Sequence, residues 1–185
     1  MGMPETAKHW TAQMVRDLPD DGNRYEVVHG QLLVTPAPGG PHQLVLGRLH
    51  AWIRAYLDPL GLGDTVLFSP ADISWGEDTL VQPDLFVFPP GEWSGEWSTI
   101  KTLRLAVEAL SPSSRRADRF IKRRLYQEQR VETYWVVDVG DRLVEVWQPS
   151  DERPAVVTDT LRWRVTADAP ELVIELDALF RDPSA

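Results

Sequence analysis

Apolar residues recur with two different periods along this chain, and each period predicts its own kind of element. A 3.6-residue apolar stripe is typical of a helix that covers a core, whereas short runs rich in Val, Leu and Phe between Gly, Pro and Ser are typical of strands. Helices are expected over 10–17, 42–57 and about 114–130. In the last of these the stripe runs through Ala117, Ile121 and Leu125, which we expect to face the core.

The strand-like runs fall into hairpins and single pieces. RYEVVHGQLLVTP predicts a hairpin that turns at Gly30, and TYWVVDV with RLVEVWQ predicts another across Gly140-Asp141. Further strands are expected in DTVLF, ADISW, TLVQPDLFVF, 105–110, VVTDT, LRWRV and ELVIEL. The mixture predicts one α/β domain over residues 1–185, with a mixed central β-sheet flanked by helices.

Composition narrows the function classes. The chain has 185 residues, no cysteine and a net charge of -9, so disulfides and thiolate metal sites are excluded and general affinity for nucleic acid is disfavoured. No apolar run approaches ~20 residues, and the N-terminus has no signal-like apolar core. We therefore expect a cytoplasmic protein without membrane contact.

Two strand-like runs each contain a carboxylate where an apolar residue is expected. Asp84 follows Pro83 in VQPDLFVF, and Glu108 lies between Val107 and Ala109. A buried carboxylate needs a partner, because an unpaired charge in a low dielectric costs several kcal/mol. Two carboxylates suit Mg²⁺ (or Mn²⁺), which keeps several waters, bridges to phosphate and activates water.

A basic segment follows Glu108 directly. Its six basic residues lie within ten positions: Arg115, Arg116, Arg119, Lys122, Arg123 and Arg124. Such a cluster is either a solvated helix face or an anion site. A helix that starts near Ser114 and folds back over the sheet brings Lys122 level with Glu108, at the edge of the apolar stripe. We expect the arginines at 115, 116, 119 and 123 to contact nucleic acid.

The ordered motifs RYEVVHG, VQPDLFVF, VEALSPSS, Lys122 with Tyr126, and YWVVD resemble the PD-(D/E)xK nuclease superfamily. More closely, residues 24–148 resemble the Uma-type putative restriction endonuclease family of small bacterial proteins. The resemblance implies a restriction-endonuclease-like fold, a metal held by Asp84 and Glu108, and a catalytic Lys122. It also implies a third acid, because the family tends to carry one in the first hairpin, where Glu26 stands. Leu110 occupies the place of the superfamily's lysine, so the lysine is expected on the helix instead.

Each of these residues also has a structural interpretation. Asp84 can close a strand beside Pro83, Glu108 can pair with Arg104 or Arg115, and Lys122 can pair with Asp118 at the surface. Glu26 can be a polar-face strand residue, His42 is interpreted as a cap or surface residue, and Asp138 as the end of its strand.

Taken together, these patterns predict a Mg²⁺-dependent endonuclease that hydrolyses phosphodiester bonds of nucleic acid, with DNA as the expected substrate. The main alternative is a catalytically silent nucleic-acid-binding or interaction protein that keeps the fold; a hydrolase of another phosphate ester is a third. A homodimer is expected, with Trp93 and Trp97 at its interface, because aromatic residues are enriched there.

Overall fold

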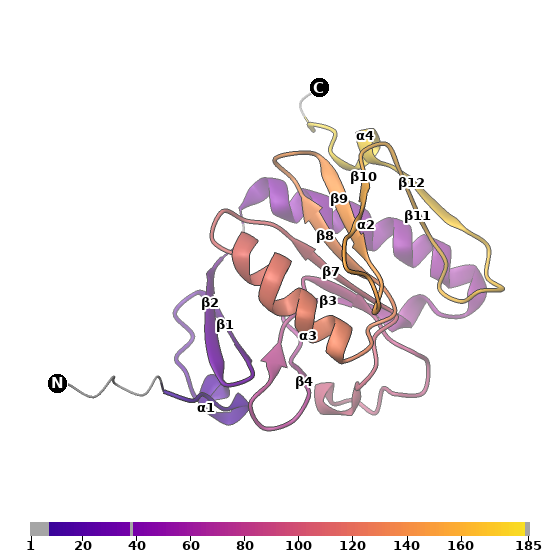
Figure 1. Ribbon diagram of the computed structural model, residues 1–185. Coiled ribbons are helices and arrows are strands. Elements are labelled where there is room, and N and C mark those ends of the chain that lie inside the picture. Colours follow the sequence, from indigo (N-terminus) through magenta and orange to yellow (C-terminus); the bar gives the residue numbers. More distant parts are fainter. Residues whose placement is uncertain (1–7, 38, 184–185) are drawn as a thin grey trace.

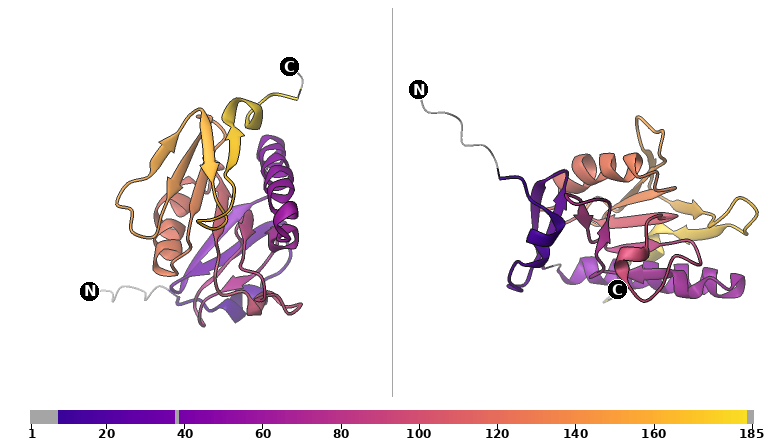
Figure 2. Two further views of the ribbon diagram at one scale, coloured as in Figure 1. Left: turned by 90° about the vertical axis from the view of Figure 1, so that its right-hand side faces the viewer. Right: turned by 90° about the horizontal axis from the view of Figure 1, so that it is seen from below.

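A six-stranded mixed sheet lies between two long helical segments, as the view from below in Figure 2 shows. The computed structural model describes residues 8–37 and 39–183. The central sheet consists of β3 (Val66–Phe68), β6 (Leu85–Val87), β7 (Leu105–Ala109), β8 (Tyr134–Asp138), β9 (Leu143–Trp147) and β10 (Ala155–Val157). Its order is β10-β9-β8-β7-β6-β3; β7 and β8 are parallel, and the other neighbours are antiparallel. The predicted α/β class, mixed sheet and 140–141 hairpin are therefore confirmed.

The remaining strands form two smaller sheets. One has the order β2 (Gln31–Pro36), β1 (Asn23–Val28), β5 (Leu80–Val81), β4 (Ile73–Ser74), and the other pairs β11 (Thr160–Trp163) with β12 (Leu172–Glu175). β1 and β2 form the predicted first hairpin, whose turn places His29 and Gly30 at positive φ of 49° and 77°, as a type I′ turn requires. The run TLVQPDLFVF, expected as one strand, splits at Pro83 into β5 and β6, because proline cannot donate to a ladder.

Two helical segments cover opposite faces of the central sheet (Figure 1). The helices are α1 (Ala12–Arg16), α2 (Gly40–Leu57), η1 (Asp58–Leu60), η2 (Gly63–Thr65), η3 (Trp97–Thr99), η4 (Ala117–Lys122), α3 (Arg123–Glu128) and α4 (Leu176–Leu179). Within the described ranges, none of them combines the length and apolar character needed to cross a membrane. α2 packs on one face, and η4 with α3 packs on the other.

Strand β7 shows how the alternation of a strand positions the site. Leu105, Val107 and Ala109 point into the core beneath α2, while Ala106 and Leu110 belong to the core beneath α3. Since side chains alternate between the two faces, Glu108 points toward α3. It is fully buried there.

The helix that covers Glu108 differs from the predicted one in phase. Ala117 and Ile121 of the expected stripe are only partly buried, whereas Asp118, Lys122, Leu125 and Tyr126 are buried. The reason is that η4 is a π-helix, in which the N–H of Arg123 donates to the carbonyl of Asp118 five residues earlier. Lys122 is 1% exposed, so it lies within the buried face rather than at the edge of the apolar stripe, but it does reach Glu108 as predicted.

Candidate active site

Lys122 lies at the centre of a cluster of buried carboxylates. Its Nζ donates to Glu108 Oε1 at 3.0 Å and forms ion pairs with Glu26 Oε2 at 2.7 Å and Asp118 Oδ1 at 3.4 Å. The Tyr126 hydroxyl donates to the same Oε1 of Glu108 at 2.9 Å. Three of the predicted catalytic residues, from β1, β7 and η4, are thus brought together in the interior.

Asp84 lies beside this cluster. The antiparallel pairing of β6 with β7 matches Leu85 with Val107, so Asp84 and Glu108 are the next residues along the two strands. The backbone N–H of Ala109 donates to Asp84 Oδ2 at 2.8 Å, which ties the carboxylate to the strand that carries Glu108.

Two side chains that the sequence did not suggest as site residues bind Asp84. The Arg24 guanidinium donates to Oδ1 at 2.5 Å, and His42 Nε2 lies 3.1 Å from Oδ2. His42 is buried and makes no cap hydrogen bond, so its interpretation as a cap or surface residue was wrong. Arg24 Nε also lies 4.0 Å from Glu26 Oε2, so this guanidinium connects Asp84 to the Lys122 cluster.

The two candidate metal ligands have opposite pKa shifts. Burial raises the pKa of Asp84. The hydrogen bond from His42 and the positive charge of Arg24 lower it by more, so the pKa of Asp84 lies below the ordinary carboxyl range. For Glu108, burial with the nearby Asp84, Asp118 and Glu26 raises the pKa well above its usual value, although Lys122 opposes this. Asp84 is therefore ionised at neutral pH. The Glu108 carboxylate is stabilised when it binds a proton or a metal cation.

Lys122 remains an ammonium in this environment. Burial lowers its pKa, but Glu108, Glu26 and Asp118 raise it by more, so the net shift is upward. Burial also raises the pKa of Asp118. Lys122 consequently carries a positive charge and donates hydrogen bonds.

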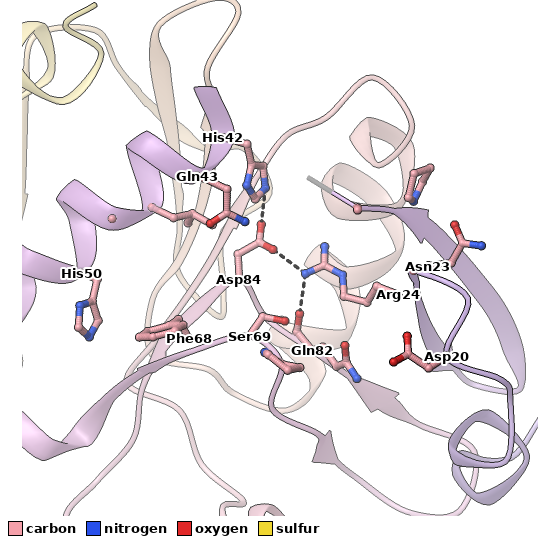
Figure 3. Close-up of a pocket in the computed structure, with 16 residues that line it drawn as sticks. Asp20, Asn23, Arg24, His42, Gln43, His50, Phe68, Ser69, Gln82 and Asp84 are labelled. Atoms are coloured by element: carbon pink, nitrogen blue, oxygen red, sulfur yellow. Dashed lines mark hydrogen bonds and ion pairs between the residues drawn. The ribbon is translucent and has the colours of Figure 1, made fainter. Parts of the chain in front are cut away.

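A cavity of about 540 Å³ opens toward Asp84 (Figure 3). Arg24, His42 and Asp84 line it, whereas Glu108 and Lys122 do not. Asp84 is therefore the candidate catalytic group that a ligand in this cavity would meet first, and the Lys122 cluster lies behind it.

The four arginines predicted to contact nucleic acid have different surroundings. Arg115 and Arg119 bind the buried Asp138, and Arg119 also binds Glu145. The Arg123 guanidinium lies 4.8 Å from the centre of the Trp147 ring. Arg116 is exposed and has no ion pair with any described residue.

Some of the structural interpretations are now decided. Glu108 pairs with Lys122 and Tyr126, and the proposed pairs with Arg104 and Arg115 were wrong. Asp118 and Lys122 do form an i,i+4 pair, but it is buried. Their spacing was visible in the sequence, as was the i,i+2 spacing that puts Arg24 and Glu26 on one side of a strand.

This chain is similar to a known family and to a solved structure. A family model described as "Putative restriction endonuclease" matches residues 12–160. The chain belongs to the Uma2 family. A solved structure, "a putative nuclease belonging to DUF820" from Anabaena variabilis ATCC 29413, superposes with a TM-score of 0.75 at 22% identity. The match covers 92% of this chain and 97% of that chain, and it supports the restriction-endonuclease-like fold. Among curated proteins, none matches significantly.

The donor set of this Uma2 family member suits a hard divalent cation. Glu108 Oε2 is buried and accepts no hydrogen bond within the described ranges, so its lone pairs are free for a cation. Those ranges contain no group of three or more His, Asp or Glu side chains placed so that together they could hold a metal ion. Mg²⁺ needs only one or two carboxylates when waters and phosphate complete its shell. On Asp84, a cation has to compete with Arg24 and His42.

Proposed function

We propose that this protein is a nuclease that uses Mg²⁺ or Mn²⁺ to hydrolyse phosphodiester bonds of DNA. The Uma2 family and its fold support nuclease activity in general. The observation that carries the finer proposal is the charge imbalance at Lys122, where one ammonium faces the carboxylates of Glu26, Glu108 and Asp118. Buried negative charges of this kind need compensation, and a divalent cation provides it.

Asp84 and Glu108 would hold the cation. Bound there, it would supply a water of lowered pKa and Lewis-acid stabilisation of the phosphate. The Ala109 N–H holds the Asp84 carboxylate beside Glu108 for this task.

Lys122 provides positive charge rather than a base. A general base needs a pKa near the working pH, and the pKa of Lys122 is shifted upward. From its buried position behind Asp84, its ammonium can therefore stabilise negative charge that develops on the phosphate. Glu26 positions this ammonium from β1, and its other oxygen accepts the N–H of Gln82, which fixes the carboxylate in turn.

A catalytically silent nucleic-acid-binding protein is the alternative. A silent member is expected to lack Asp84, Glu108 or Lys122, whereas all three are present and adjacent here. This favours an enzyme.

The test is cleavage of single- and double-stranded DNA and RNA with Mg²⁺, Mn²⁺ or EDTA. We expect metal-dependent cleavage of DNA that is lost in Asp84→Asn and retained in Asp177→Asn, a matched change at an exposed aspartate on α4. Binding without cleavage by the wild-type protein in either metal would support the silent alternative.

Metal binding can be tested without activity. Mn²⁺ should raise the melting temperature by mass action, because it binds only the folded site. A double variant with Asp84→Asn and Glu108→Gln should lose that rise. An equal rise in the double variant would show that the metal binds elsewhere.

We also propose a homodimer, which would place two active sites on one duplex. The 89–101 loop supports this, because Trp93 is 45% exposed there and its ring lies 5.0 Å from that of Trp97. Sedimentation equilibrium should give twice the monomer mass, and Trp93→Ser should reduce it. A monomer at tens of micromolar would contradict the proposal.

A further inference from the structure

An aromatic side chain stands exposed at the mouth of the cavity beside Asp84. Phe68, at the end of the edge strand β3, is 57% exposed. Its ring meets that of His50 from α2 edge-on, with centroids 5.0 Å apart and planes at 84°. Both residues line the cavity (Figure 3). A large exposed aromatic ring supported by a second ring offers a flat face to a ligand.

This aromatic ring is close to the candidate catalytic group. Phe68 pairs with Leu85, the residue after Asp84, and the N–H of Ser69 donates to the Asp84 carbonyl at 3.1 Å. Arg24 reaches the side-chain carboxylate of Asp84 from the other side of the cavity. A ligand in the cavity can therefore touch the Phe68 ring at one end and a cation beside Asp84 at the other.

Helix α2 forms the remaining wall. Leu46 and Gly47 line the cavity with Gln43. The Gln43 side chain is exposed and makes no hydrogen bond to any described residue, so both its donor and its acceptor are available. A volume of about 540 Å³ lies within the usual range for a small-molecule site, which is ~300–1,000 Å³.

We propose that this cavity binds one unpaired nucleobase of the substrate strand, stacked on Phe68, with the adjoining phosphate beside Arg24 and Asp84. The inference rests on the proposed nuclease function and names its substrate class: single-stranded DNA, or a duplex with one nucleotide turned out. A stacked, paired base cannot enter, since its faces are covered by its neighbours. Stacking also supplies affinity that a chain of net charge -9 gains poorly from phosphate contacts.

The experiment compares two oligomers with the same phosphates. Fluorescence anisotropy in EDTA measures binding of the wild-type protein to labelled oligothymidylate and to an abasic oligomer of equal length, with both checked for integrity afterwards. We expect oligothymidylate to bind roughly 5- to 100-fold more tightly, the scale of one aromatic stacking contact. A fully paired duplex should bind no more tightly than the abasic oligomer.

Two variants locate the effect. Phe68→Ala should remove the difference between the oligomers, whereas Phe120→Ala should keep it; Phe120 is an equally exposed phenylalanine (58%) on η4. Gly47→Phe should also remove the difference by filling the cavity, because a Cβ at this position meets nothing within 4 Å. Urea denaturation checks that all three variants fold.

The outcomes separate this inference from the proposed function. The base site would be overturned by any of four results: equal binding of the two oligomers, a duplex bound as tightly as oligothymidylate, or no binding at all. The fourth is an equal effect of Phe68→Ala and Phe120→Ala. Cleavage in Mg²⁺ or Mn²⁺ without base-dependent binding would overturn it alone. Base-dependent binding without cleavage would keep the base site and overturn the nuclease proposal.

Discussion

Two buried carboxylates on the parallel strands β7 and β8 are each held by basic side chains from the same helical segment, yet their surroundings differ. Asp138 accepts hydrogen bonds from Arg115 and Arg119, and also from the N–H groups of Gly140 and Asp141. There the two guanidinium groups face the carboxylates of Asp138 and Glu145, and Arg115 also pairs at 3.7 Å with Asp141, which is exposed so that solvent screens its charge. At Glu108, a single ammonium faces three carboxylates.

The difference shows in the pKa shifts. Burial raises the pKa of Asp138, but the Asp141 N–H and the two arginines lower it by more, so the charged form is favoured. Burial raises the pKa of Glu108, and its one lysine does not reverse this. Both Asp138 and Glu108 thus stand in a strand and are bound by a basic helix, although Asp138 belongs to a structural cluster and Glu108 to a candidate metal site. The two differ in how far the nearby positive charges compensate the buried carboxylates.

The largest effect is expected when the unbalanced cluster of Glu26, Glu108, Asp118 and Lys122 loses its ammonium. Lys122→Met should lower the single-turnover cleavage rate by ~10²–10³-fold, the usual scale for one preorganised electrostatic group. Mn²⁺ affinity, measured by calorimetry, should not fall, since an ammonium is not a ligand. Lys122→Arg should restore little of the cleavage rate, because a planar guanidinium replaces a compact ammonium.

Arg115→Met in the balanced cluster is the matched control for this change. It should leave the single-turnover rate at saturating DNA within a few-fold of wild type. Full cleavage by Lys122→Met with weaker DNA binding would instead make Lys122 a phosphate contact.

Breaking the balanced cluster should affect stability. Asp138→Asn leaves two arginines without their shared carboxylate, which should cost about 1–3 kcal/mol in urea unfolding at pH 7. Because the pKa of Asp138 is lowered in the folded state, its stabilisation is present above the ordinary carboxyl pKa of about 4. It is lost as pH falls through the folded-state pKa. A difference between variant and wild type that persists at the lowest pH would contradict this assignment.

Removing one charge from the unbalanced cluster should have a smaller effect of opposite sign. Glu108→Gln should stabilise the metal-free protein by on the order of 1 kcal/mol, because a neutral side chain no longer has to be buried as an anion. The pKa of Glu108 is raised on folding, so the gain should be absent below the ordinary carboxyl pKa and grow as pH rises. Asp84→Asn, at a carboxylate whose pKa is lowered, should destabilise instead. Urea unfolding from pH 4 to 8 measures both.

The smallest effect is expected at Arg116, which belongs to neither cluster. Arg116→Ala should weaken DNA binding a few-fold and reduce the slope of log affinity against log salt by about 1, as loss of one phosphate contact does. Stability should stay within ~0.5 kcal/mol of wild type. An unchanged salt slope would remove Arg116 from the DNA-binding surface.

The sequence predicted the elements better than their mutual placement. Helix α2 and both hairpins followed from apolar period and turn residues, which are local signals. Asp84 and Glu108 stood out because a charge in an apolar run is locally unusual. Arg24 and His42 did not, because an arginine in a hairpin and a histidine near a helix start are ordinary locally, and only the fold brings them to Asp84.

The π-helical segment η4 gives the site a dependence on main-chain geometry. In a regular α-helix, residues four apart are rotated by about 40°, and a wider turn reduces this angle. Asp118 and Lys122 therefore lie closer to one line facing Glu108, and Tyr126 follows one turn later in α3. Deleting a single residue in this turn would regularise the helix and rotate Lys122 away from its carboxylates. The register of the backbone here is as much a part of the site as the identity of its side chains.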